Sequence, residues 1–441
     1  MTRSAHPSPH DDPAVRRALS ALGNDARSEL AIGGIPTSEL IRAFGSPLYA
    51  FDGDALRARA REVRAAFGPS IRILYSIKAN PSVALTSILR EEGCGAEIAS
   101  LGELAVARAA GHAAQDLRFA GPGKSRIELE AALRQGLGVF HVESESEARD
   151  LAALAQQASD PIRVALRVNL TRRSHGGRLR MAGTGSRFGV DETRALELLR
   201  ELAAEPRLQL TGLHAYSGTQ CFAATDFLSH AEDLCSLADQ WEQELAAPLS
   251  EIDLGGGFGV ATYLGDPFFD LSQAAAGLRE LLVAPQRAQR THMVELGRFL
   301  TAPCGVYLAT VTRAKQSGEA SSLALDGGMH HCAIGTGGGS VLRRPPLLVH
   351  AGALDQAPAE LASIGGPLCT PHDQFAEAIW MPRIREGDVL ALLNAGAYGL
   401  TYSPTGFLSH ASAAEVLIEG GKARIIRQRG SVDDALRGQL R

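Results

Sequence analysis

Short apolar runs alternate with amphipathic stretches along the chain between about residues 48 and 303. The stretches at residues 125–136, 144–158 and 191–205 carry apolar side chains at i, i+3 and i+4, which predicts helices. The apolar runs predict eight strands, at residues 71–79, 95–100, 117–121, 137–143, 162–168, 208–216, 251–257 and 292–298. Eight strands that alternate with helices over about 250 residues favour a TIM-like (β/α)8 barrel, although an open doubly wound sheet shows a similar alternation.

The pattern changes after residue 304, where short strand-like segments follow one another with few helical stretches between them. The predicted fold is therefore α/β, with a barrel over residues 48–303 and a mostly β C-terminal domain, sandwich-like or barrel-like, over residues 304–441. Residues 26–47 are expected to join this β domain from the other end of the chain. Residues 1–25 are polar and are expected to form a disordered lead-in.

Composition and charge narrow the class of protein. A net charge of −5 leaves no basic footprint for nucleic acid or for an anionic membrane. The first 17 residues lack the apolar core of a signal peptide, and there is no run of 18 apolar residues to span a bilayer. The six cysteines have no CxxC spacing, so neither a metal finger nor a disulfide framework is indicated. We expect a globular cytoplasmic enzyme without nucleic-acid or membrane partners.

Reactive and charged residues stand where the predicted strands end, which is where a β/α barrel carries its functional groups. They are Lys78, Glu97, Ser100, His141, Glu143, Arg167, Asn169, Tyr216, Ser217, Gly255–Gly257, Glu295 and Arg298. Lys78 is either an ion-paired lysine or an amine that forms a Schiff base. The glycines after the seventh strand either make a tight turn or expose backbone N–H groups to a phosphate. Glu295 and Arg298 either pair with each other or contact a pyridine nitrogen and a phosphate.

Seven motifs, in order from about residue 45 to 420, carry a resemblance to a known family. They are YSIKAN (75–80), GAEIASLGEL (95–104), SRFGV (186–190), DLGGGFG (253–259), ELGR (295–298), GGPLC (365–369) and GAYG (396–399). The chain resembles the fold-type III pyridoxal-phosphate-dependent decarboxylases, which include diaminopimelate, ornithine and arginine decarboxylases. The resemblance implies decarboxylation of an L-amino acid with pyridoxal 5'-phosphate as cofactor.

The resemblance also implies a role for individual residues. Lys78 would bind the cofactor as an internal aldimine, and Glu295 would keep the pyridine nitrogen protonated. Glu97 and Arg167 would lie near the lysine and the ring. Cys369 would come from the neighbouring subunit of a homodimer with shared active sites and would protonate the quinonoid carbon. The phosphate would lie against Thr219, Gly256, Gly257, Arg298 and the hydroxyl group of Tyr398.

Three departures from the family pattern concern the substrate. Tyr216 stands where the family usually has a histidine stacked on the pyridine ring, so an aromatic face is kept. Thr370 follows Cys369 where diamino-acid decarboxylases have an acidic residue, and this removes a contact worth about 1.5–3 kcal/mol. The arginine that holds a distal carboxylate in diaminopimelate decarboxylases has no counterpart in register. The candidates left to contact substrate are Arg343, Arg344, His330, His331, Thr370 and Asp373. The two histidines are equally compatible with a structural role, and too few ligands accompany them to predict a metal site.

Four features together resemble one branch of the family: the His330–His331 pair, the glycine-rich stretch 335–340, CTPHD (369–373) and SPTGFLSH (403–410). This branch accompanies acyl-carrier-protein and exosortase systems and includes the glutamyl-carrier-protein decarboxylase of butirosin biosynthesis. The resemblance implies a small amino-acid substrate, free or tethered to an acyl carrier protein. A diaminopimelate, ornithine or arginine decarboxylase acting on a free amino acid is the alternative. An amino-acid racemase and a non-catalytic cofactor-binding protein are less compatible with the GGPLC loop and the second domain.

Overall fold

The computed structural model describes residues 8–170, 179–180, 186–245, 247–337 and 344–440. Eight parallel strands form a barrel that closes because β8 pairs with β7 on one side and with β11 on the other. Each strand coincides with one of the eight predicted runs, so the predicted TIM-like barrel is confirmed. The strands are β4 (Ile71–Ser76), β5 (Gly95–Ile98), β6 (Leu117–Phe119), β7 (Val139–Val142), β8 (Ile162–Asn169), β11 (Leu208–His214), β13 (Glu251–Gly256) and β14 (Thr291–Leu296).

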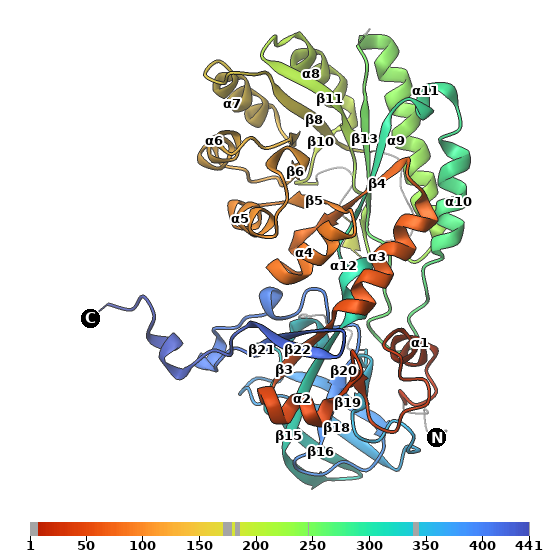
Figure 1. Ribbon diagram of the computed structural model, residues 1–441, viewed down its shortest axis with the longest axis vertical. Coiled ribbons are helices and arrows are strands. Elements are labelled where there is room, and N and C mark those ends of the chain that lie inside the picture. Colours follow the sequence, from red (N-terminus) through yellow and green to blue (C-terminus); the bar gives the residue numbers. More distant parts are fainter. Residues whose placement is uncertain (1–7, 171–178, 181–185, 246, 338–343, 441) are drawn as a thin grey trace. The chain divides into compact units, whose positions relative to one another are not determined.

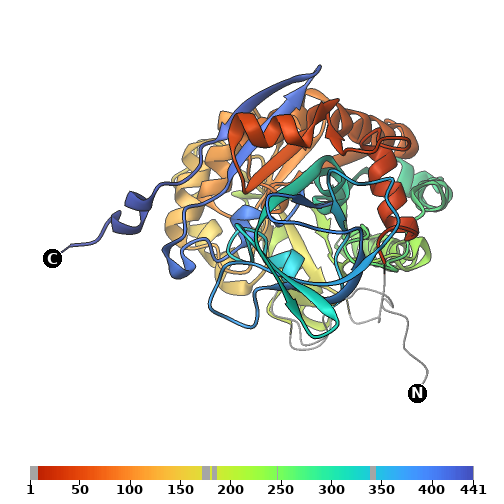
Figure 2. The ribbon, with the colours of Figure 1, turned by 90° about the horizontal axis from the view of Figure 1, so that it is seen from below.

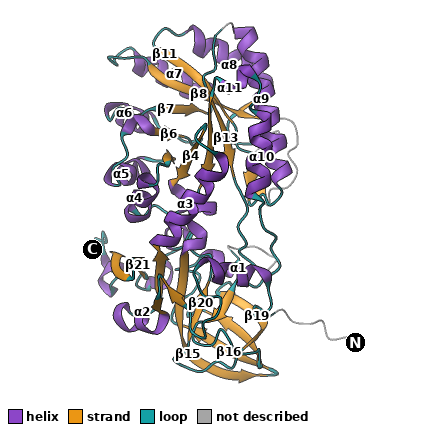
Figure 3. Ribbon diagram, turned by 45° about the vertical axis from the view of Figure 1, so that its right-hand side comes forward, coloured by secondary structure: helices purple, strands orange, loops and turns teal. Residues whose placement is uncertain are grey.

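Helices form an outer layer around these strands (Figures 1 and 3). Serine side chains accept a backbone N–H at the start of several of them, and Ser125 forms a complete capping box with Glu128. No helix in the described ranges is both long and apolar enough to cross a membrane. The helices are α3 (Gly53–Phe67), α4 (Val83–Glu91), α5 (Leu101–Ala109), α6 (Arg126–Arg134), α7 (Glu145–Ala155), α8 (Glu192–Ala204), α9 (Ala224–Leu245), α10 (Leu271–Leu281), α11 (Pro285–Ala288) and α12 (Arg298–Thr301).

A second compact unit contains a nine-stranded sheet, which confirms the predicted strand-rich C-terminal domain. Seven strands follow the order β19-β18-β16-β15-β3-β21-β22, and β20 pairs with both β15 and β17. β15 and β16, teal in Figure 2, form its long hairpin. The strands are β3 (Leu48–Asp52), β15 (Gly305–Ser317), β16 (Ala320–Leu325), β17 (Leu348–His350), β18 (Glu360–Gly365), β19 (Gln374–Met381), β20 (Val389–Leu392), β21 (Ala414–Glu419) and β22 (Lys422–Arg427).

Two segments near the N-terminus differ from the prediction. β3 lies in the nine-stranded sheet between β15 and β21, so residues 48–52 do not begin the barrel. Residues 13–21 form a helix, α1 (Pro13–Ala21), within the stretch predicted to be disordered. Asp12 caps this helix, and Ala14, Val15 and Ala18 are buried on one face of it. The same unit contains α2 (Thr37–Phe44) and a small hairpin of β1 (Ala31–Ile32) and β2 (Ile35–Pro36).

Candidate active site

Lys78 and Glu97 form an ion pair at the mouth of the barrel. Lys78 lies in a 3₁₀ turn, η1 (Ile77–Ala79), directly after β4, and Glu97 lies on the neighbouring strand β5. The Lys78 Nζ donates to both carboxylate oxygens of Glu97, at 2.9 and 3.1 Å. The Glu97 side chain is 2 % exposed, whereas that of Lys78 is 38 % exposed. A buried carboxylate thus positions an amine that stays partly exposed.

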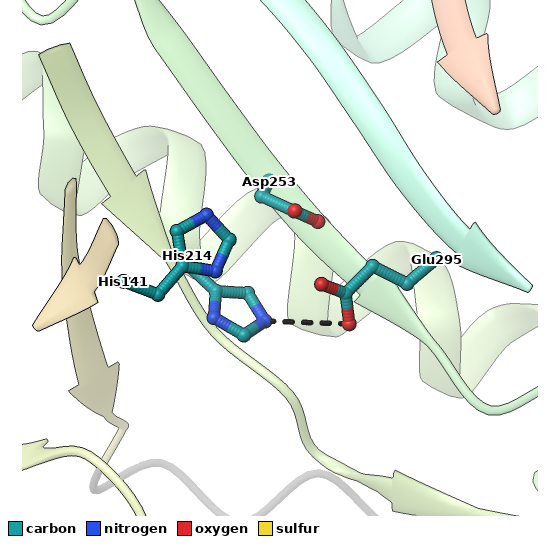
Figure 4. A group of neighbouring side chains, drawn as sticks. All are labelled: His141, His214, Asp253 and Glu295. Carbon is teal, nitrogen blue, oxygen red and sulfur yellow. Dashed lines mark ion pairs between the residues drawn. The ribbon is translucent and has the colours of Figure 1, made fainter. Parts of the chain in front are cut away.

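Four polar side chains meet inside the barrel near the same end (Figure 4). His141 on β7, His214 on β11, Asp253 on β13 and Glu295 on β14 each offer an atom within 4.8 Å of the others. The two imidazole rings lie 4.4 Å apart between centroids, and His214 Nε2 is 3.5 Å from Glu295 Oε2. Two imidazoles and two carboxyl groups at this spacing are a donor set that a divalent metal accepts. The absence of a metal site therefore stays a prediction.

The electrostatics of this cluster favour neutral partners around Glu295. Burial lowers the pKa of His141 and of His214 well below the usual range, so both imidazoles are neutral. Burial and the nearby Glu295 raise the pKa of Asp253, which keeps its carboxyl group protonated. Among the described residues, His141 Nδ1, His214 Nδ1 and Glu295 Oε1 have no hydrogen-bond partner, whereas His214 Nε2 lies 3.5 Å from Glu295 Oε2. Buried polar atoms are usually satisfied, so these three atoms are candidates to contact a polar ligand.

The glycine turn at the end of β13, Gly255–Gly257, requires glycine at three successive positions. Gly255 and Gly257 have φ values of +61° and +82°, in the left-handed region. A Cβ on Gly256 would overlap the carbonyl oxygen of Glu295, and one on Gly257 would overlap that of Gly218. The backbone therefore passes closer to its neighbours than any side chain would allow, as the backbone of a phosphate-binding turn must.

Phe258 holds this turn in place. Its buried ring stacks on Phe269 at 4.2 Å between centroids and meets Phe227 and Phe299 edge to face, at 4.8 and 5.3 Å. Aromatic pairs in these geometries add about 0.5–1.5 kcal/mol each beyond the area that they bury. The turn is thus fixed by the core immediately behind it.

Other predicted cofactor contacts surround this turn and the end of β8. Arg167 Nη1 donates to Glu143 Oε1 at 2.9 Å, and both side chains are almost completely buried. The Tyr216 ring lies against Gly255, and its centroid is 5.9 Å from Lys78 Nζ. Thr219 ends the short strand β12 (Gly218–Thr219), which pairs with β9 (Leu179–Arg180), and Arg298 begins α12 directly after β14. The barrel thus brings the predicted lysine, carboxylate, arginine and glycine groups to one end.

The remaining predicted residues lie in the second unit. Cys369 is exposed on the loop between β18 and β19, and Asp373 holds that loop. The buried Asp373 carboxylate accepts the backbone N–H of Met329 at 2.6 Å and that of Leu368 at 2.8 Å. A Cβ on Gly328 or Gly366 would overlap this carboxylate. Thr370 is half-buried, and its hydroxyl accepts the backbone N–H of His372.

The other candidates in this unit are held by internal contacts. Arg344 pairs with Asp266 at 2.6 Å. His331 is buried, and its Nε2 lies 2.9 Å from the Ala411 carbonyl, while the His330 ring lies against it, tilted by 42°, at 3.8 Å between centroids. Burial lowers the pKa of His330 to about 3 and that of His331 to about 4. Arg343 falls outside the described residues.

Tyr398 adopts a left-handed backbone, with φ of +53°. Such a conformation costs a non-glycine residue roughly 1–3 kcal/mol and is frequent at functional sites.

Comparison with known proteins identifies the family. Residues 54–302 match the pyridoxal binding domain of the pyridoxal-dependent decarboxylases. The chain is 33 % identical over 407 residues to the L-glutamyl-[BtrI acyl-carrier protein] decarboxylase of Niallia circulans, covering 91 % of this chain and 95 % of that protein. It is also 32 % identical over 421 residues to the diaminopimelate decarboxylase of Zymomonas mobilis, covering 93 % and 96 %. The chain belongs to the pyridoxal-dependent decarboxylase family.

Solved structures of this family share the fold. The diaminopimelate decarboxylase of Helicobacter pylori, complexed with L-lysine, is 26 % identical, with a TM-score of 0.82 over 91 % of this chain and 98 % of that one. The enzyme from M. jannaschi gives a TM-score of 0.86 at 22 % identity, over 94 % and 96 %. The protein is accordingly a pyridoxal-phosphate-dependent amino-acid decarboxylase, as its sequence predicted.

Two observations show that the residues of this barrel are suited to hold the cofactor. The first is the unpartnered oxygen of Glu295, buried beside neutral imidazoles, where a protonated pyridine nitrogen would be matched. The second is the turn at Gly255–Gly257, where side chains are excluded and backbone N–H groups can meet a phosphate. Both features stand at strand ends on the same side as Lys78.

Sequence reasoning assigned no role to Asp253, His214, His141 or Glu143. Two of these residues carry a visible signal, because His141 and Glu143 stand at the end of a predicted strand. Asp253 lies inside its strand and precedes the glycines by two residues, which looks like a turn-capping aspartate. Its Oδ1 does accept the Gly255 N–H at 3.0 Å. Its closeness to Glu295 follows from the pairing of β13 with β14, which local sequence does not reveal.

Proposed function

We propose that this decarboxylase acts on an L-aminoacyl group tethered to an acyl carrier protein, with an L-glutamyl group as the first candidate. The observation that carries the proposal is that, among the described residues of the loop around Cys369, no acidic side chain next to the cysteine is free. Thr370 and Pro371 follow the cysteine, and both oxygens of Asp373 accept backbone N–H groups. A free diamino acid would lack a partner for its distal ammonium group, whereas a tethered group needs none. The similarity to a carrier-protein decarboxylase supports the same choice.

The barrel residues would hold the cofactor and set its protonation. Lys78 would bind it covalently through Nζ, and the paired Glu97 would accept and return the proton of that amine. Glu295 would hold a proton at the pyridine nitrogen, and the neutral His214 and protonated Asp253 would keep further charge away from this contact. Pyridoxal phosphate, when bound, supplies an electron sink for the electron pair left by the departing carboxyl group.

The phosphate would lie against the glycine turn. Backbone N–H groups at Gly256 and Gly257 would donate to it, with Thr219, Arg298 and Tyr398 as further contacts. Tyr216 would lie beside the ring and cover it from solvent. Arg167 would act through Glu143, which also accepts the backbone N–H groups of Gly121 and Gly189 and so ties together the neighbouring strand ends.

Cys369 would protonate the carbon that loses CO2. Its loop is exposed on its own unit, which suits a residue that completes the site of a second subunit in a homodimer. Asp373 would position the cysteine by fixing the loop from within.

The test is CO2 release by purified holoenzyme. Carrier protein loaded with an L-glutamyl group, and the same carrier loaded with other aminoacyl groups, are compared with free glutamate, lysine, ornithine and diaminopimelate. The proposal expects kcat/KM for one carrier-bound substrate to exceed that of its free counterpart by tenfold or more. Efficient turnover of free diaminopimelate or ornithine, with none of the carrier-bound groups, would overturn it in favour of a free-substrate decarboxylase.

A further inference from the structure

A large cavity opens at the N-terminal ends of β4, β5 and β6, the opposite end of these strands from Lys78 and Glu97. Its volume is about 810 Å³, which is in the range of small-molecule sites. Five arginines and one acidic residue line it, alongside small and apolar side chains. The charged lining residues are Arg61, Arg64, Arg72, Arg90, Arg118 and Asp116. A protein with a net charge of −5 thus concentrates positive charge in one hollow.

Some of these arginines pair with a carboxylate, and others do not. Arg61 forms a bidentate pair with Glu92 at 2.7 and 2.8 Å. Arg118 pairs with Glu251, which Arg163 also contacts. Across the described ranges, by contrast, no carboxylate lies within hydrogen-bond distance of the remaining three. Arg64 donates to the Glu92 backbone carbonyl and Arg90 is 3.9 Å from Glu91, while Arg72 makes no hydrogen bond or ion pair with another described residue.

Arginines at helix ends have an ordinary explanation, which covers only part of this cavity. Arg64 and Arg90 lie in the last turns of α3 and α4, where a cation interacts favourably with the helix dipole. Arg72 and Arg118 lie on strands β4 and β6, not at a helix end. Arg118 pairs with Glu251, so Arg72 is the cavity arginine that neither a helix end nor a carboxylate in the described residues accounts for.

Buried polar atoms at the cavity lack partners as well. The Arg118 side chain is 3 % exposed, and its Nε has no hydrogen-bond partner among the described residues. The same holds for Nε2 of the buried lining residue His112. Burial and the charge of Arg90 lower the pKa of His112 to about 4, as expected in a positive environment. The cavity therefore offers donors and positive charge that the protein itself leaves unmatched.

We propose that this cavity binds a phosphate-bearing small molecule, with Arg72 and Arg90 as contacts to its phosphate. Guanidinium groups match phosphate oxygens in pairs, which makes arginine the residue of choice for this ligand. The apolar part of the lining, which includes Ile73 and Leu74, would accept the organic body of the ligand. The site is separate from the cofactor phosphate site at the other strand ends and does not depend on which amino acid is decarboxylated.

Isothermal titration of the holoenzyme with inorganic pyrophosphate, at constant ionic strength, tests the proposal. Pyrophosphate is the probe, because the bound cofactor already fills the phosphate site at the active centre. We expect saturable binding to the wild-type protein, and a dissociation constant at least about tenfold higher for Arg72→Gln and for Arg90→Gln. Arg72→Lys keeps the charge but not the paired donors, so its dissociation constant should lie between those of the wild-type protein and Arg72→Gln.

The matched control is Arg126→Gln. Arg126 is an exposed arginine on α6 that pairs with Asp150 outside the cavity, so pyrophosphate binding should be unchanged. Circular dichroism and the cofactor absorbance of each variant verify that fold and active site are intact. No saturable binding to the wild-type protein, or equal binding by Arg72→Gln, Arg90→Gln and Arg126→Gln, would overturn the proposed site.

Discussion

Replacing Gly257 with alanine should weaken cofactor binding and destabilise the barrel together, because this position is restricted in two ways. A left-handed backbone at φ of +82° costs an alanine roughly 1–2 kcal/mol. A Cβ would also overlap the Gly218 carbonyl oxygen, which belongs to the backbone and cannot rotate away. Relieving the overlap requires the turn to move by about 1 Å, a displacement that can cost on the order of 10²-fold in rate.

The effect on the cofactor follows from the hydrogen bonds that the turn would donate. Losing one charge-assisted bond to the phosphate costs about 1.5–3 kcal/mol, so the cofactor dissociation constant should rise by tenfold to about a hundredfold. The assay is titration of cofactor-free protein with pyridoxal phosphate, followed by the cofactor absorbance. Urea unfolding of the same samples gives the free energy of unfolding.

Gly136→Ala is the matched control for the backbone strain. Gly136 has φ of +72°, and nothing lies within 4 Å of a Cβ built on it. It should lose stability by the left-handed cost alone and bind the cofactor normally. If folded Gly257→Ala binds the cofactor within about twofold of the wild-type affinity, the glycine turn does not hold the phosphate and the reasoning is refuted.

Three further predictions follow from the site. Asp253→Asn should remove a pH dependence of stability. Because the pKa of Asp253 is raised, the native protein keeps a proton that the unfolded chain loses above pH about 3.9, so wild-type stability falls as pH rises towards the native pKa. Urea unfolding of cofactor-free protein should therefore favour the variant more at pH 8 than at pH 5. An equal difference at both pH values would contradict the protonated state. Mixing inactive Lys78→Ala with inactive Cys369→Ala should restore about a quarter of the activity if each site combines two subunits in random dimers; no restoration after verified subunit exchange would place both residues of a site in one chain. Phe258→Ala should cost about 3–5 kcal/mol in the free energy of unfolding, and a loss below 1 kcal/mol would mean that the phenylalanine cluster does not fix the turn.

The barrel could be predicted from sequence because each of its strands has a recognisable local sequence pattern. Each is a short apolar run with a polar residue at its end, and each alternates with a helix of regular period. Residues 48–52 misled this reasoning because all five positions of β3 are buried, as they would be in a barrel strand. The pairing of β3 with β15, more than 250 residues later, is a tertiary fact that no local pattern contains. The helix at residues 13–21 was hidden by the polar residues that precede it, although Asp12 and Pro13 are ordinary signals for a helix start.

The candidate site likewise has features that the local sequence reveals and features that only the folded structure reveals. Lys78 and Glu295 are readable because a charge at the end of an apolar strand is unusual. The neutral state of His141 and the proton on Asp253 depend on the closure of the barrel around them. Arg344 was a substrate candidate because basic residues stand near that point of the family pattern. Its partner Asp266 lies 78 residues earlier, so only the folded structure reveals that its charge is already matched.

The way in which Asp373 holds its loop has a consequence for how substrate choice can change. The carboxylate fixes the main chain at Leu368, immediately before Cys369, while residues 370–372 are exposed or half-buried on the outside of the same loop. Substitutions in these three positions can therefore alter charge and shape beside the cysteine while Asp373 still fixes the backbone at Leu368. Such a segment can be exchanged independently of the chemistry. It is therefore the natural place to introduce an acidic residue and change the specificity of this enzyme towards a diamino acid.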